Sequence, residues 1–277
     1  EELRHALAKY HGLKDEQVFL GNGSDEVLAL TFLTFFNGSD PVLFPNISYS
    51  FYPVYCDLYQ MNYKEIILDQ DFKMYVEDFK QPNSGIIFPN PNAPTGLLVS
   101  LDFIEEVLKS NPDSIVVVDE AYIELSSNPD VKSMVSEISD DTNVVVARTF
   151  SKLYGLAGVR LGYAMCNKEM HAILQKCTSV FTGSRVALAG AMAALDDEEY
   201  IKKTKAAMLE GRKYLTDEFT KMGFYVYPSE TNFLYVNTGY NAAEFAEECK
   251  KYGLIIRGNF DYSRITVGRM DQNEKMV

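Results

Sequence analysis

The sequence has no tryptophan, three histidines and four cysteines. His5, His11 and His171 are scattered and form no His-Glu-x-x-His pattern, so a metal site is not predicted. The cysteines lie far apart without a Cys-x-x-Cys pair, which favours reduced thiols in a cytosolic protein. Zinc-dependent and disulfide-stabilised classes are therefore disfavoured.

Positive charge is also scarce, with 26 basic against 39 acidic side chains and a net charge of −13. Such a chain repels a polyphosphate backbone, so nucleic acid is not an expected partner. The apolar runs are too short to span a bilayer, and residues 1–4 do not read as a signal peptide. We expect a cytoplasmic protein with small-molecule partners and no membrane association.

Short, mostly β-branched runs bounded by turn residues recur along the first part of the chain, and helical patterns separate several of them. This alternation predicts an α/β fold in which helices cover both faces of a mainly parallel sheet. We expect a large domain over residues 1–195 and a small α+β domain over 196–277. The predicted strands are residues 18–20, 42–44, 66–68, 86–88, 115–118, 144–147 and 161–165, then 224–227, 232–236, 254–256 and 264–267. Ligands are expected at the carboxyl ends of the parallel strands.

Lys152 stands directly after one of these strands, among hydroxyls and glycines. An ordinary surface lysine is the alternative, but at the end of a strand its amine can form a Schiff base with an aldehyde cofactor. Thr149, Ser151 and Arg160 offer hydroxyl and guanidinium donors to a phosphate. These two features together describe how pyridoxal phosphate is held.

Asp119 ends the apolar run Val116–Val118. A carboxylate at the end of a buried strand needs a partner, and the protonated ring nitrogen of pyridoxal phosphate is one. Tyr122 is close enough along the chain to reach the phenolic oxygen of the ring, although a tyrosine of the core is its alternative role.

Three further segments add weaker signals. Ser24 and Asp25 begin a helix after a glycine turn, which suits a phosphate, although capping of that helix is the alternative. Tyr49 follows a strand and could stack on the pyridine ring, or pack a turn with its neighbouring aromatics. The proline-rich loop 90–96 predicts a fixed loop, with a cis bond before Pro94, that aims the amide of Asn92.

In their order along essentially the whole chain, these motifs resemble fold-type I pyridoxal-phosphate aminotransferases, and most closely the histidinol-phosphate aminotransferase family. The resemblance rests also on Glu230-Thr231-Asn232-Phe233 and on Arg264-Ile265-Thr266-Val267-Gly268. It implies a homodimer with amino-donor and 2-oxo-acid substrates. It makes Lys152 the Schiff-base lysine and proton carrier. It implies contacts of the cofactor ring with Asp119, Tyr122 and Tyr49, contacts of its phosphate with Ser24, Asp25, Thr149, Ser151 and Arg160, and contacts of the anionic substrate with Arg257 and Arg264.

Three departures from that family stand in the sequence. The family's N-terminal arm has no counterpart before Glu1, and the final helix after Arg269 is short. Ala93 stands where the family more often has a second asparagine, so of that pair Asn92 alone could reach the ring oxygen. The stretch 179–185 is shorter than its counterpart.

The resemblance thus implies transamination between histidinol phosphate and 2-oxoglutarate, giving imidazole-acetol phosphate and glutamate in histidine biosynthesis. An aromatic-amino-acid aminotransferase or a phosphothreonine decarboxylase on the same scaffold is the nearest alternative. A non-catalytic, transaminase-like binding module is a third.

Overall fold

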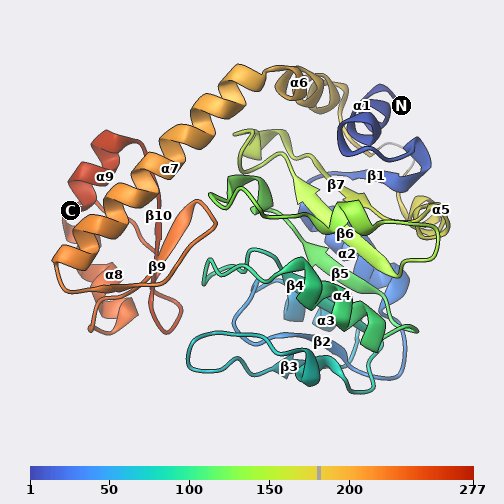
Figure 1. The fold of residues 1–277 in the computed structure, drawn as a ribbon, viewed down its shortest axis with the longest axis horizontal. Helices are drawn as coiled ribbons and strands as arrows, with labels where there is room; N and C mark the ends of the chain where they lie inside the picture. The colour runs from blue at the N-terminus through green and yellow to red at the C-terminus, as the bar shows by residue number, and fades with distance from the viewer. Residues whose placement is uncertain (180–181) are drawn as a thin grey trace.

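The protein, described by a computed structural model for residues 1–179 and 182–277, is built on a mixed seven-stranded sheet (Figure 1). The strand order is β1-β7-β6-β5-β4-β2-β3. Strands β2, β3, β4, β5 and β6 run parallel to one another, whereas β7 is antiparallel to both β6 and β1. Their bounds are β1 (Val18–Gly21), β2 (Val42–Pro45), β3 (Tyr63–Ile66), β4 (Gly85–Pro89), β5 (Val116–Asp119), β6 (Val144–Thr149) and β7 (Gly162–Met165). The predicted mainly parallel α/β sheet is confirmed.

Alternating side chains of the central strands feed two separate cores, because successive residues of a strand point to opposite faces. On β5, Val116 and Val118 join a core with α1 (Glu2–His11) and α4 (Leu101–Ser110). Val117 joins the opposite core with α2 (Ser24–Phe35), α3 (Tyr52–Leu58) and α5 (Lys168–Cys177). Both faces of the sheet are thus covered, which accounts for the continuous apolar runs.

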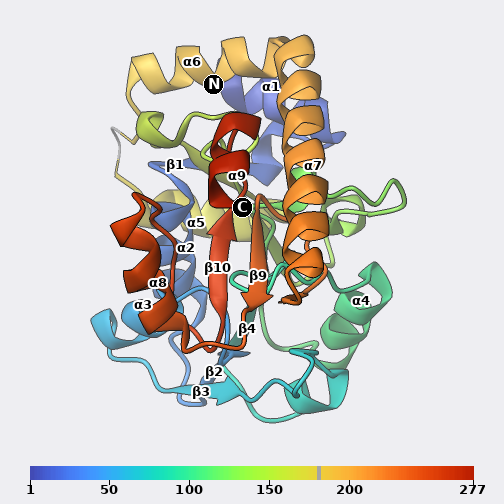
Figure 2. The same ribbon diagram turned by 90° about the vertical axis from the view of Figure 1, so that its left-hand side faces the viewer.

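A second unit follows, with a small antiparallel sheet of order β10-β9-β8 (Figure 2). Before it, α6 (Arg185–Asp196) packs against α1 of the large unit. The elements of the second unit are α7 (Glu198–Lys221), β8 (Tyr225–Val226), β9 (Phe233–Asn237), α8 (Ala242–Lys251), β10 (Ser263–Thr266) and α9 (Met270–Met276). The long helix α7 runs from the side of α1 and α6 to this sheet (Figure 1). The expected boundary between residues 195 and 196 therefore falls near the start of α7 and stays a prediction.

Two predicted strands are wrong in part. Residues 254–256 form no strand, and only the next residue, Arg257, makes a single bridge, to Arg264. In the other case β3 lies at 63–66 rather than 66–68, and Ile67 is exposed. Both segments lie where a partner strand is absent on at least one side, so an apolar sequence is not sufficient to extend them.

The remaining connections include short 3-10 turns and the fixed loop between β4 and α4. The turns are Asp15–Gln17, Val76–Phe79, Ile123–Leu125, Met134–Glu137 and Ala157–Val159. In the loop, the bond before Pro94 is cis as predicted, and the bond before Pro91 is also cis. Val180 and Phe181, within the stretch noted above as short, lie outside the described residues. None of the helices of the described residues is both long and apolar enough to cross a membrane.

Candidate active site

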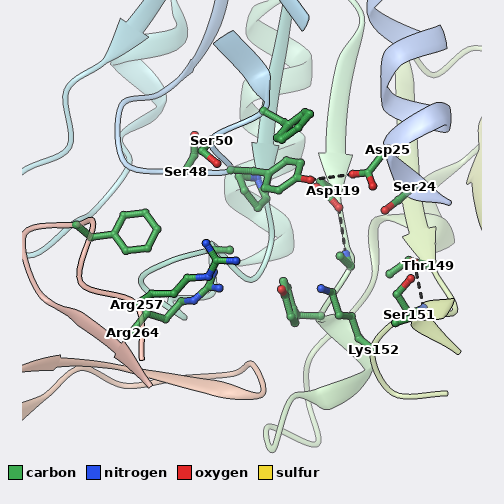
Figure 3. A pocket seen from close by; sticks show the side chains of 18 of the residues that line it. Ser24, Asp25, Ser48, Ser50, Asp119, Thr149, Ser151, Lys152, Arg257 and Arg264 are labelled. Atoms are coloured by element: carbon green, nitrogen blue, oxygen red, sulfur yellow. Dashed lines mark hydrogen bonds between the residues drawn. The ribbon is translucent and has the colours of Figure 1, made fainter. Parts of the chain in front are cut away.

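A cavity of about 390 Å³ opens at the carboxyl ends of β2, β5 and β6, where the second unit meets the large sheet (Figure 3). This is the edge at which parallel sheets bind ligands. All of the predicted site residues except Asn92 line the cavity, namely Ser24, Asp25, Tyr49, Asp119, Tyr122, Thr149, Ser151, Lys152, Arg160, Arg257 and Arg264. The two units together thus gather side chains that are up to 240 positions apart in sequence (Ser24 to Arg264).

Lys152 projects into this cavity from the turn that follows β6 (Figure 3). Its Nζ lies 5.0 Å from the ring centroid of Tyr122. The Tyr122 ring in turn packs edge-on against Phe233 of β9, with centroids 5.3 Å apart. No described carboxylate forms a salt bridge with Lys152, so the amine is not committed to a structural ion pair.

Asp119 is the last residue of β5 and is only 6% exposed. Its Oδ1 accepts a hydrogen bond from the backbone N–H of Ala121, and its Oδ2 accepts one from the hydroxyl of Tyr52, both at 3.2 Å. Burial raises the pKa of this carboxyl to about 6, against the lowering effect of Tyr52, Ala121 and the charge of Lys152. Near neutral pH, Asp119 is a buried carboxylate with an open side toward the cavity.

A buried ion pair fixes the strand ends that carry these groups. Glu120 follows Asp119, and Arg148 precedes Thr149, so both point away from the cavity. The Nη2 and Nε of Arg148 lie 2.9 and 3.1 Å from Oε2 of Glu120. This pair links the ends of neighbouring strands β5 and β6, which carry Asp119 and Thr149.

The N-terminus of α2 forms a second wall of the cavity. Gly23 precedes it with φ +85°, and no side chain caps the first turn. A Cβ on Gly162 would lie 2.3 Å from the backbone nitrogen of Ser24, and a Cβ on Gly23 would lie 2.5 Å from Nη2 of Arg160. Glycine at both positions keeps the free amides and the guanidinium close together, as an anion site requires.

Asp25 links two other predicted residues. Its Oδ2 lies 2.9 Å from Nη2 of Arg160, and its Oδ1 accepts a hydrogen bond of 2.8 Å from the hydroxyl of Tyr49. The Tyr49 ring is also stacked on Phe51, with centroids 5.8 Å apart. On the adjoining turn, the backbone N–H of Ser151 donates to Oγ1 of Thr149 at 3.1 Å.

Two arginines of the second unit face the opposite side of the cavity (Figure 3). Arg257 and Arg264 are joined by backbone hydrogen bonds of 3.1 and 2.9 Å, which place them on adjacent segments. The Arg264 guanidinium lies 4.9 Å from the Phe233 ring and 5.9 Å from the Phe260 ring. Burial lowers the pKa of Arg264, and its buried Nε has no hydrogen-bond partner among the described residues.

No described carboxylate pairs with either arginine. Arg264 is half-buried and Arg257 is exposed, and partly buried positive charge without a counter-charge is unfavourable, so this side of the cavity suits an anion.

Asn92 is placed differently from the expectation. It is buried in the loop after β4, and its Nδ2 donates to the carbonyl of Ile47 at 3.0 Å and to Oγ1 of Thr95 at 2.9 Å. Ala93, not Asn92, lines the cavity beside Asp119. In this structure the amide of Asn92 holds the loop to the segment after β2.

Several residues at the site were not predicted from sequence. Ser48, Ser50 and Phe51 line the cavity next to Tyr49, and Asn259 and Phe260 line it between the two arginines. Their position beside predicted residues is the signal that could have found them. Tyr52 does not line the cavity, and no sequence pattern connects it with Asp119, to which its hydroxyl donates a hydrogen bond.

The fold and the site together define an aminotransferase. The family model for aminotransferases of class I and II matches residues 1–277, and the chain belongs to this family. Among the described residues, no group of His, Cys, Asp and Glu side chains could hold a metal ion.

Histidinol-phosphate aminotransferases are among the proteins to which the chain is similar in sequence. The chain is 41% identical over 286 residues to histidinol-phosphate aminotransferase 1 of Pseudomonas aeruginosa, covering 100% of this chain and 80% of that protein. It is 41% identical to the histidinol-phosphate aminotransferase of Acinetobacter baylyi, covering 99% and 78%.

Solved structures share the fold. The histidinol-phosphate aminotransferase of Clostridium acetobutylicum superposes with a TM-score of 0.91 at 25% identity, covering 99% of this chain and 85% of that one. The enzyme of Sinorhizobium meliloti, in complex with pyridoxal-5'-phosphate, superposes with a TM-score of 0.90 at 24% identity, covering 99% and 78%.

Proposed function

We propose that the protein is a pyridoxal-phosphate-dependent aminotransferase that converts histidinol phosphate and 2-oxoglutarate into imidazole-acetol phosphate and glutamate. The observation that carries the proposal is one cavity that holds an uncommitted lysine, a buried carboxylate and two arginines without counter-charges. The identity of 41% to proteins of that name supports the choice of substrate. A site in the cytoplasm is in keeping with this function.

The residues at the base of the cavity suit the cofactor. The glycine-lined N-terminus of α2, with Arg160 and Ser151 beside it, offers donors to a phosphate. Asp119 offers an acceptor to a ring nitrogen and Lys152 offers an amine to an aldehyde. When bound, pyridoxal phosphate supplies that aldehyde and a ring that withdraws electrons from the reacting carbon.

The protein's own groups would then divide the work as follows. Lys152 Nζ would take the proton from the substrate carbon that bears the amino group and would return it at the second reacting carbon. Asp119 stabilises positive charge at the ring nitrogen, and Tyr122 donates a hydrogen bond to the phenolic oxygen. Arg257 and Arg264 hold the phosphate of one substrate and the far carboxylate of the other, so a single anion site serves both half-reactions.

A comparison of amino donors tests this function. Histidinol phosphate should be converted far faster than histidinol or phenylalanine, because only the phosphate ester brings a dianion to Arg257 and Arg264. The measurement is kcat/KM with 2-oxoglutarate as acceptor. Arg264→Ala should lower kcat/KM for histidinol phosphate and glutamate alike, by about tenfold to a hundredfold, while pyridoxal-phosphate affinity stays the same.

Arg269→Ala is the matched control, since this exposed arginine pairs with Asp271 away from the cavity. This variant should leave kcat/KM for histidinol phosphate and for glutamate, and the affinity for pyridoxal phosphate, unchanged. Equal or faster turnover of phenylalanine would reject histidinol phosphate as the substrate and would leave aminotransferase activity intact.

We also propose a homodimer. Phe51, Val54 and Leu58 on α3 and the turn before it are 46%, 45% and 65% exposed, and Phe51 also lines the cavity. A second copy covering this apolar face would border the active site. Sedimentation should give twice the mass of the chain, and Leu58→Glu should weaken the association. A fully active monomer would exclude the proposal.

A further inference from the structure

Tyr52 is a buried residue that no part of the proposed reaction uses. It begins α3, is 0% exposed and does not line the cavity. Its ring packs against Phe44, with centroids 5.8 Å apart, and against Tyr49, with centroids 5.6 Å apart. This packing fixes the ring, so its hydroxyl has one direction in which to donate.

The hydroxyl of Tyr52 points to the cofactor's proposed counter-charge. Three tyrosines spaced three residues apart each donate a hydrogen bond at this place. Tyr49 donates to the Asp25 carboxylate, Tyr55 to the Asp25 backbone carbonyl at 3.2 Å, and Tyr52 alone to the Asp119 carboxylate at 3.2 Å. Tyr52 therefore differs from its neighbours in what it contacts.

The hydrogen bonds of Asp119 leave its carboxylate able to accept further donors. Each of its two oxygens already accepts one bond, from Ala121 and from Tyr52, although an ionised carboxylate can accept about four. Donors from behind the cavity wall fix the plane of the carboxyl group. They also favour its charged form, which burial alone disfavours.

We propose that Tyr52 is a positioning residue that keeps Asp119 ionised and turned toward the ring nitrogen of the cofactor. The proposal rests on the proposed function, because it takes pyridoxal phosphate as the ligand of the cavity. Other charged or titratable groups that act on Asp119 or face it are Lys152, which favours its charged form, Asp25, which opposes it, and the hydroxyls of Tyr49 and Tyr55. None of these forms a hydrogen bond with Asp119 among the described residues, so the donor lost in Tyr52→Phe has no replacement in place.

Binding to the cofactor-free protein separates this role from a general role in folding. The probes are pyridoxal phosphate and an analogue in which a C–H group replaces the ring nitrogen. The unsubstituted protein should prefer pyridoxal phosphate. Tyr52→Phe should reduce the ratio of the two affinities by about tenfold. Asp119 can pair only with the ligand that has a ring nitrogen, so weakening the charged form of Asp119 should affect only that ligand.

Tyr55→Phe is the matched control, since it removes a hydroxyl from the same helix that donates to a backbone carbonyl. It should leave the affinity ratio unchanged. Tyr52→His retains a side-chain donor and should recover part of the preference. An equal loss of affinity for both probes, or no change in the ratio, would overturn the role of Tyr52.

The pH dependence gives a second measurement. Preference for pyridoxal phosphate should disappear on acidification as Asp119 takes up a proton, and Tyr52→Phe should move this midpoint upward by about one pH unit. An unmoved midpoint would contradict the proposal. If the unsubstituted protein bound both probes equally at every pH, the pairing of Asp119 with the ring nitrogen would itself be wrong, and the proposal would be overturned with it.

Discussion

Replacement of Lys152 by alanine should abolish the covalent link between the protein and pyridoxal phosphate that borohydride reduction makes permanent. Lys152 is the one described lysine among the residues that line the cavity, and it has no carboxylate partner there. The same amine is proposed to carry the proton between the two reacting positions. Turnover should therefore fall by roughly a thousandfold or more, which combines the loss of a nucleophile and of a general base.

Mass spectrometry of the reduced protein measures the link, and single-turnover absorbance with glutamate measures the chemistry. Lys168→Ala is the control, since this lysine is exposed and pairs with Asp140. It should keep both the link and the rate. A reducible adduct that persists in Lys152→Ala would show that a different amine holds the cofactor.

Replacement of Asp119 by alanine should leave the protein folded and lower kcat by about a hundredfold to a thousandfold, as expected when a charge-stabilising group leaves a desolvated site. Asp119→Asn retains the shape of the side chain without its charge, so it should lose nearly as much. Steady-state kinetics at saturating cofactor provide the measurement. Turnover close to that of the unsubstituted protein would argue against a partnership with the ring nitrogen.

The stability of the cofactor-free protein gives Asp119 a separate signature. Its pKa is raised from 3.8 to about 6 in the folded state, so between these values the folded chain holds a proton that the unfolded chain has lost. Stability should then decrease as pH rises from about 4 to about 6, by up to about 3 kcal/mol. Asp119→Asn should remove this decrease, which thermal unfolding across that range would reveal.

The core of the fold was predictable because the central strands are buried on both faces. Residues 115–118 and 144–147 are runs of valine with neighbouring isoleucine or alanine, and the structure places β5 and β6 within one or two residues of these bounds. Strands at the margins were less predictable. Ile255 is 88% exposed in a segment that forms no strand, since its neighbours supply no ladder of hydrogen bonds there.

The candidate site residues were predictable where a side chain with few possible roles stands at the end of a strand or shortly after it. Asp119 and Lys152 could be found in this way, since their type and position suit only a few roles. Tyr52 could not be found, because its contact with Asp119 joins residues 67 positions apart and depends on where α3 begins. The inward turn of Asn92 likewise follows from the local fold of its loop, which composition does not fix.

The residues proposed to bind the cofactor and those proposed to bind the substrate anion come from different sheets, which matters for how substrate choice could evolve. Asp119 ends β5 and Lys152 follows β6 of the seven-stranded sheet, whereas Arg264 belongs to β10 of the three-stranded sheet and Arg257 is bridged to it. Under the proposed function, mutations of these two arginines and the turn between them should change substrate choice without disturbing Lys152 and Asp119. A library confined to residues 257–264 is therefore a compact starting point for directed evolution toward new amino donors.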